Sequence, residues 1–277
     1  MGNELPYCKF TRTIILLVFL LIHISFPACK PEAGDDPTGE GKIIVLMYHR
    51  IVDGNTSNLY ERSIGDLESD IKYLSDNNIN IIDFDELGLV LSGGKMPAGN
   101  SAIITFDDGD HSWYSLVRPL FAKHKIKAAF FLWTNMIGEN SFLSWEEVEN
   151  MSHYTINPGI RLFTFGSHSC SHRYLYQSKN EYPTPEEYKS FLDYEFGSSK
   201  QIIEKHTPGN VRVFALPYGD GAGESEIIDA AKRNGYQFIR TSYWGAIENT
   251  ETDPFFIPSL PMLDSTDPQI IGTYLGL

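Results

Sequence analysis

The sequence predicts an α/β fold in which helices cover a parallel β-sheet. Short apolar runs alternate with helical patterns along most of the chain, and these runs are apolar almost throughout. Strands buried on both faces have that composition, and they occur in parallel sheets whose crossovers are helices. In sheets of this kind the active site lies at the carboxyl ends of the strands, so the residues that follow each strand are of most interest.

The elements follow one another in a regular order. The predicted strands are residues 43–47, 79–82, 102–106, 127–133, 161–165, 211–215 and 236–240. The predicted helices between them are residues 66–74, 84–91, 115–124, a helix opening at 144, 184–206 and 224–234. Leu67, Ile71 and Leu74 give the first helix an apolar stripe. Ser144 and Thr184 each stand three residues before a glutamate, a pattern that begins a helix.

The first 29 residues have the composition of an export signal. Lys9 and Arg12 precede an apolar run from Ile14 to Phe26, and Ala28-Cys29 follows. The run is shorter than the ~20 residues that span a bilayer, and an uncleaved anchor is the alternative. Cys29 resembles the lipidated first residue of a bacterial lipoprotein. We expect an exported, membrane-anchored protein that faces the periplasm or the cell exterior, with its N-terminal lipid as the only membrane contact.

The rest of the chain divides into a tether and one domain. Residues 30–41 are rich in Pro, Gly and acidic residues, and they contain no large apolar side chain, which is typical of a flexible tether. Residues 42–277 are expected to form a single catalytic domain. The net charge of −14 and the lack of clustered Lys and Arg argue against nucleic acid as a partner.

Two carboxylates and two imidazoles follow predicted strands. Asp107 and Asp108 come after strand 102–106, and His168 and His172 after strand 161–165. One carboxylate with two imidazoles leaves a metal position open for water, as a catalytic zinc requires, and the second carboxylate can accept a proton. Each motif alone is common in turns and surface loops. Their joint placement after successive strands predicts a metal-dependent hydrolytic site.

The segments that carry these residues resemble the motifs of the polysaccharide deacetylase family, the NodB-like carbohydrate esterases of family 4. Residues 101–109 resemble the first motif, Ser167-His168 with His172 the second, and 216–219 most of the third. Residues 46–50 resemble the branch that deacetylates poly-N-acetylglucosamine. The resemblance covers about residues 43–261 and implies a distorted, incomplete (β/α) barrel.

The resemblance also implies roles for single residues. Asp108, His168 and His172 would bind Zn²⁺, with Ni²⁺ or Co²⁺ as alternatives. Asp107 would be the base, and the backbone amide of Tyr218 would help to hold the oxyanion. The substrate would be an acetylated polysaccharide, with an N-acetylglucosamine polymer favoured. Pro217 and Trp244 are the expected substrate contacts. Further aromatic residues near the rim of the site fit a glycan groove: Trp113, Tyr114, Trp145 and Tyr243.

The sequence departs from the family pattern in three places. Ala215 stands where the family has an arginine, and Arg240 either replaces it or is an ordinary surface residue. The stretch 257–262 lacks the late histidine of the family, so His49 and His111 are the candidate general acids. Cys170, between the two histidines, is an alternative zinc ligand that its spacing disfavours. These departures leave two other functions open: an inactive glycan-binding lipoprotein of the same fold, and an O-acetyl esterase of the xylan type.

Overall fold

The computed structural model describes residues 41–157 and 159–277. They belong to one compact unit. The predicted export signal, Cys29 and residues 30–40 of the predicted tether lie outside the described residues. Among the residues that are described, no helix has the length and apolar character that crossing a membrane requires.

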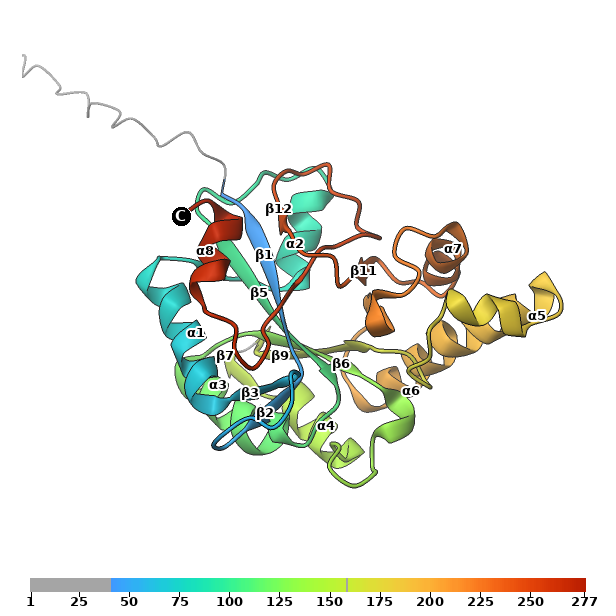
Figure 1. Ribbon diagram of the computed structural model, residues 1–277, viewed down its shortest axis with the longest axis horizontal. Coiled ribbons are helices and arrows are strands. Elements are labelled where there is room, and N and C mark those ends of the chain that lie inside the picture. The colour runs from blue at the N-terminus through green and yellow to red at the C-terminus, as the bar shows by residue number, and fades with distance from the viewer. Residues whose placement is uncertain (1–40, 158) are drawn as a thin grey trace, which may run out of the picture. The chain divides into compact units, whose positions relative to one another are not determined.

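A nine-stranded, mainly parallel sheet forms the centre of the domain (Figure 1). Its central order is β11-β10-β9-β6-β5-β1-β12, while β13 also pairs with β1 and β4 with β5. The bounds are β1 Ile43–Tyr48, β4 Asn80–Ile81, β5 Ser101–Asp108, β6 Ala128–Leu132, β9 Phe163–Ser167, β10 Val213–Ala215, β11 Phe238–Arg240, β12 Ala246–Ile247 and β13 Leu260–Pro261. Among the described strands of this sheet, only β12 runs antiparallel to its neighbour. The predicted parallel sheet is thus confirmed.

The segment after β11 brings the last and first strands of the sheet together. Arg240 of β11 forms a parallel bridge with Ile257, and Leu260 of β13 pairs with Leu46 of β1. The amide of Met262 donates to the carbonyl of Met47 at 2.9 Å. The sheet therefore curls toward a barrel that is closed on this side by a short, irregular segment. This is the distorted, incomplete (β/α) barrel that the sequence predicts.

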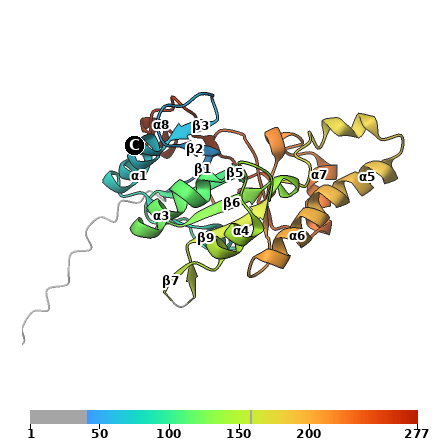
Figure 2. The same ribbon diagram turned by 90° about the horizontal axis from the view of Figure 1, so that it is seen from below.

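Within residues 41–157 and 159–277, eight α-helices surround the curled sheet (Figure 1). They are α1 Ile64–Asp76, α2 Phe84–Leu91, α3 Arg118–His124, α4 Trp145–Ser152, α5 Pro185–Asp193, α6 Ser199–His206, α7 Ser225–Arg233 and α8 Gln269–Leu275. Both predicted capping boxes are present, with Ser144 opening α4 and Thr184 opening α5. Two small pairs lie outside the main sheet: β2 Arg50–Val52 with β3 Glu61–Ser63, and the hairpin of β7 Thr155–Asn157 with β8 Ile160–Arg161, which projects outward in Figure 2.

Side chains that alternate along the strands build two separate cores. Ile43 and Ile103 belong to the core inside the barrel, where α2 contributes Phe84, whereas Ile44 and Ile104 belong to the larger core beneath the outer helices. Because every second residue of a strand shares a face, Asp107 of β5 lies on the same face as Ile103. The alternation therefore directs Asp107 into the barrel at the carboxyl end of its strand.

One predicted helix differs from the structure in a way that affects the site. Residues 184–206 form α5, a π-helical turn at Tyr194–Ser198, and α6, instead of one continuous helix. A π turn contains one more residue per hydrogen-bonded ring than an α turn, and such turns are frequent at functional sites. Glu195 lies in this turn and is 1% exposed, so the irregular turn places a carboxylate in the protein interior.

Candidate active site

The carboxylates of Asp107 and Asp108 diverge at the end of β5. Asp107 is 2% exposed and points into the barrel, whereas Asp108 is half-buried. Asp108 has a φ of 92° and is followed by Gly109 with a φ of 108°, so the chain turns sharply here. Burial raises the pKa of Asp108, but the hydrogen bond to His172 and the nearby imidazoles outweigh it and hold this pKa below the usual range. Asp108 is therefore an anion at neutral pH.

His168 presents one ring nitrogen as a lone-pair donor. Its Nδ1 lies 2.9 Å from the carbonyl oxygen of Ala215, and a carbonyl can only accept, so Nδ1 carries the proton and Nε2 is free. Burial lowers the pKa of His168 to about 4. The ring is therefore neutral at physiological pH, which is the state that binds a metal.

His172 brings a second ring nitrogen to the same point. Its Nε2 lies 3.1 Å from Nε2 of His168 and 3.3 Å from Oδ1 of Asp108, while Nε2 of His168 lies 3.5 Å from that oxygen. Ligands at about 2.1 Å around a tetrahedral ion are about 3.4 Å apart, so the three atoms fit one divalent ion. The set of one carboxylate and two imidazoles suits zinc.

Arg240 is the counter-ion of Asp107. It ends β11, is 1% exposed, and its Nη2 donates to Oδ2 of Asp107 across the barrel interior. Its Nη1 contacts Sδ of Met47 at 2.8 Å. The alternative of an ordinary surface arginine is therefore wrong. The other oxygen of Asp107, Oδ1, is buried and has no hydrogen-bond partner within the described part of the chain.

Glu195 holds the loop that contains both histidines, a role that the sequence patterns do not predict. Its Oε2 accepts hydrogen bonds from the amides of Cys170 and Ser171, both at 2.9 Å, and its Oε1 accepts one from the Ser171 hydroxyl at 2.5 Å. The loop also needs this support because Ser169 and His172 have positive φ angles. Glu195 follows α5 within a predicted helix, and only the π turn reveals that it faces the loop.

A pocket of about 470 Å³ opens over these groups. Apart from the charged residues it is lined by, among others, His49, Tyr60, Leu216, Tyr218, Trp244 and Leu263. Tyr218 has a φ of 58°, and its hydroxyl lies 3.1 Å from Nδ1 of His172. Pro217 is buried in the same turn and is not among the lining residues. The pocket therefore combines the candidate metal ligands with exposed aromatic side chains.

Other residues singled out from the sequence lie away from the pocket. His111 is half-exposed, and its Nε2 is 3.1 Å from Oε1 of Glu147. Cys170 is buried, its pKa is raised to about 11 by burial, and its sulfur is 3.5 Å from the Tyr194 carbonyl rather than among the converging ligand atoms. Trp113 is fully buried in the outer core, which corrects its expected place at the rim.

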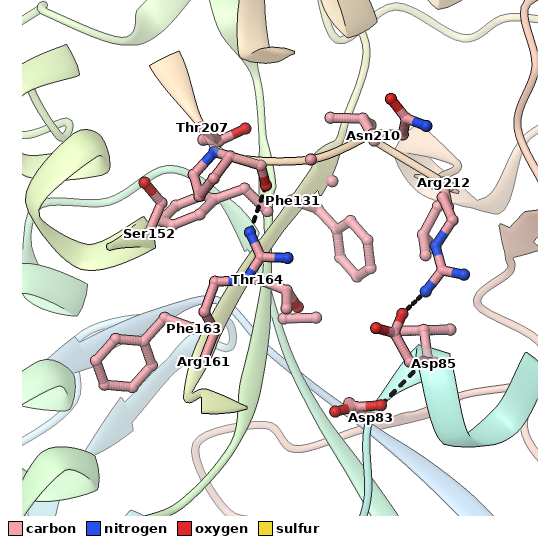
Figure 3. Close-up of a pocket in the computed structure, with 18 residues that line it drawn as sticks. Asp83, Asp85, Phe131, Ser152, Arg161, Phe163, Thr164, Thr207, Asn210 and Arg212 are labelled. Atoms are coloured by element: carbon pink, nitrogen blue, oxygen red, sulfur yellow. Dashed lines mark hydrogen bonds and ion pairs between the residues drawn. The ribbon is translucent and has the colours of Figure 1, made fainter. Parts of the chain in front are cut away.

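A second cavity, of about 280 Å³, is drawn in Figure 3. Its lining includes the beginnings of strands, so it lies at the end of the barrel opposite the candidate metal ligands. It is bounded by the beginnings of β9 and β10 and by Asp83 and Asp85 at the start of α2. Arg161 and Arg212 lie on opposite sides of it in Figure 3, but Arg161 donates to the Pro208 carbonyl and Arg212 pairs with Asp85. Arg212 is thus paired with a carboxylate and Arg161 is bonded to a backbone carbonyl, whereas the candidate metal ligands line the other pocket, where we place the candidate active site.

A family model described as polysaccharide deacetylase matches residues 94–239, just over half of the chain. A Bacillus subtilis protein named as a putative polysaccharide deacetylase is 28% identical over 74% of this chain and 66% of its own length. A Staphylococcus aureus protein named poly-beta-1,6-N-acetyl-D-glucosamine N-deacetylase is 24% identical over 97% of this chain and 98% of its own length.

Solved structures share the fold at low sequence identity. A Streptococcus pyogenes deacetylase superimposes with a TM-score of 0.71 at 20% identity, covering 84% of this chain and 98% of its own. IcaB from Ammonifex degensii gives a TM-score of 0.71 at 22% identity, and the likeness covers 86% of this chain and 99% of IcaB. The fold expected from the sequence motifs is confirmed by these likenesses.

Proposed function

Because the chain belongs to the polysaccharide deacetylase family, we propose that it is a hydrolase of amide bonds other than peptide bonds, which removes N-acetyl groups from an N-acetylglucosamine polymer. The observation that carries this proposal is the convergence of Asp108, His168 and His172 beside a buried carboxylate with one free oxygen. Relatives that align over nearly the whole chain are named for that polymer, which supports the choice of substrate.

Asp108, His168 and His172 would hold a divalent metal ion, with Zn²⁺ as the first choice and Ni²⁺ or Co²⁺ as alternatives. When bound there, the metal would lower the pKa of a water molecule and polarise the acetyl carbonyl. Asp107 would take the proton of the attacking water at Oδ1, the oxygen that is free of partners. Arg240 fixes the orientation of this carboxylate through Oδ2.

Two further groups complete the proposed chemistry. The backbone amide of Tyr218 would stabilise negative charge on the acetyl oxygen, because Tyr218 lines the pocket beside His172. The departing sugar amine needs a proton, and His49 lies in the pocket whereas His111 is bonded to Glu147 outside it. We therefore assign the general-acid role to His49. Trp244, which is 57% exposed at the rim, would contact the sugar.

We also propose the organisation of the whole chain. Residues 1–29 would be an export signal ending in a lipid-modified Cys29, residues 30–41 a tether, and residues 42–277 the catalytic domain. The composition of the first 41 residues supports this division. Metabolic labelling with a radioactive fatty acid tests it: label should enter the wild-type chain and not Cys29→Ser. Equal labelling of both would refute lipidation at Cys29.

Acetate release tests the proposed activity. The full-length protein would be assayed on a β-1,6-linked N-acetylglucosamine oligomer with Zn²⁺, with a chelator, and as Asp107→Asn. The exposed Asp229→Asn serves as a matched control for the loss of one charge. We expect release that requires both the metal and Asp107. Folded, zinc-loaded protein without release would indicate a glycan-binding protein, and release only from acetylated xylan would indicate an esterase.

A further inference from the structure

A hollow of about 530 Å³, distinct from the cavity in Figure 3, adjoins the candidate active-site pocket. The two share four lining residues: Tyr218, Gly219, Ser242 and Trp244. The ring of Tyr218 meets the ring of His172 edge to face, with 4.7 Å between their centroids, and stacks on the ring of Tyr174, with 4.2 Å between their centroids. Tyr218 therefore forms the boundary between the two hollows, and a polymer bound over the metal ligands would continue into the second hollow.

The aromatic residues of this hollow are available for contact. Tyr174, Tyr218, Tyr243 and Trp244 are 45–57% exposed, in contrast to the buried aromatic residues of the cores. Exposed aromatic faces of this kind pack against the apolar faces of sugar rings. The shape and the side chains therefore fit a further sugar unit of the same chain.

The charge of the hollow selects among sugars. As far as the described residues form it, the lining contains two carboxylates, Asp220 and Glu224, and no Lys, Arg or His. Asp220 is occupied, because it accepts hydrogen bonds from the amides of Tyr176 and Gln177. Among the described residues, the carboxylate of Glu224 has no hydrogen bond or ion pair, and the nearby Lys179 is paired with Glu226. One partly buried anion is thus free to meet a cation.

We propose that this hollow binds a glucosamine unit, the cationic product of deacetylation, next to the unit that reacts. This inference rests on the proposed function, because only a deacetylase acting on such a polymer creates an amine beside its own active site. Glu224 would pair with the ammonium group while Tyr243 and Trp244 contact the ring. A chain that has already been deacetylated at one unit would then bind better than an untouched one.

The test uses two ligands that carry no acetyl group. The affinities of the zinc-loaded, full-length protein for a β-1,6-linked glucosamine trisaccharide and the matching glucose trisaccharide would be measured by calorimetry at about pH 6, where the amines are charged. We expect the glucosamine trisaccharide to bind roughly two- to fivefold more tightly, which is the gain that one partly exposed ion pair provides. In Glu224→Gln this ratio should fall toward one.

Two further variants make the result specific. Asp229→Asn removes one negative charge from α7, the helix that begins directly after Glu224, at a position outside the hollow, and it should keep the wild-type ratio. Tyr243→Ala should weaken both sugars by a similar factor. Equal binding of the two trisaccharides by the wild type, or an equal loss of the ratio in Asp229→Asn, would overturn the proposal. Because neither ligand releases acetate, these outcomes are independent of whether the protein is a deacetylase.

Discussion

Replacing Arg240 with methionine should destabilise the domain by leaving a charge alone in the barrel. Asp107 and Arg240 are 2% and 1% exposed, so solvent cannot replace the lost partner. Removing one member of a buried ion pair costs about 3–5 kcal/mol, because the desolvated charge remains without compensation. Methionine preserves most of the length and apolar volume of arginine, so the loss of charge dominates over the loss of packing.

Urea unfolding of the metal-free protein, followed by circular dichroism, measures this cost. A double-mutant cycle with Asp107→Asn isolates the pair: Arg240→Met and Asp107→Asn should each lose several kcal/mol, and the double variant should lose much less than their sum. Arg240→Lys keeps the charge and should lie between wild type and Arg240→Met. Additive losses, or a loss below about 1 kcal/mol for Arg240→Met, would refute the assignment of a buried, coupled pair.

Three further outcomes follow from the described geometry. Glu195→Ala leaves three donors of the histidine loop without their acceptor, so it should weaken zinc binding by roughly 10- to 100-fold in a competition titration. Glu195→Gln should be less affected, and an unchanged zinc affinity in both variants would contradict the positioning role of Glu195. Burial lowers the pKa of His168 from 6.5 to about 4, so the unfolded state takes up a proton first as the pH falls across this range, and the free energy of unfolding of the metal-free protein should decrease. His168→Gln should lessen this dependence of stability on pH, and an identical dependence in both proteins would argue against a buried, neutral His168. Gly219→Ala should lower the unfolding temperature more than Gly235→Ala. Both glycines have a positive φ, but only at Gly219 would the added Cβ meet a neighbour, 1.9 Å from Oγ of Ser242. Equal losses in the two variants would show that this contact is relieved without cost.

The sequence predicts the parts of the site that follow directly from local patterns. Strand β5 is a run of apolar residues that ends in two carboxylates, and the pairing of strands at one edge brings those carboxylates to the histidines after β9. The site residues therefore converge because parallel strands share an end, which periodicity and chain order are enough to indicate. The family resemblance then adds a role for each residue.

Other parts depend on contacts that no local pattern contains. The alternation of Phe238 and Arg240 could place the arginine inside the barrel, but its pairing with Asp107 requires the sheet to curl. Glu195 sits within an apparently continuous helix, and a regular helical period does not direct it toward the histidine loop. Strands β12 and β13 have two residues each and pair through tertiary contacts, so they leave no periodic signal.

The pairing of Asp107 with Arg240 also constrains the order in which the site can form. The two residues are 133 positions apart, and the segment that joins β11 to β1 comes later still in the chain. During synthesis, β5 and the carboxylate at its end therefore emerge long before their counter-ion exists. The base can be fixed only after nearly the whole domain has been made, so a chain that ends between His172 and Arg240 has the three candidate metal ligands without the fixed carboxylate.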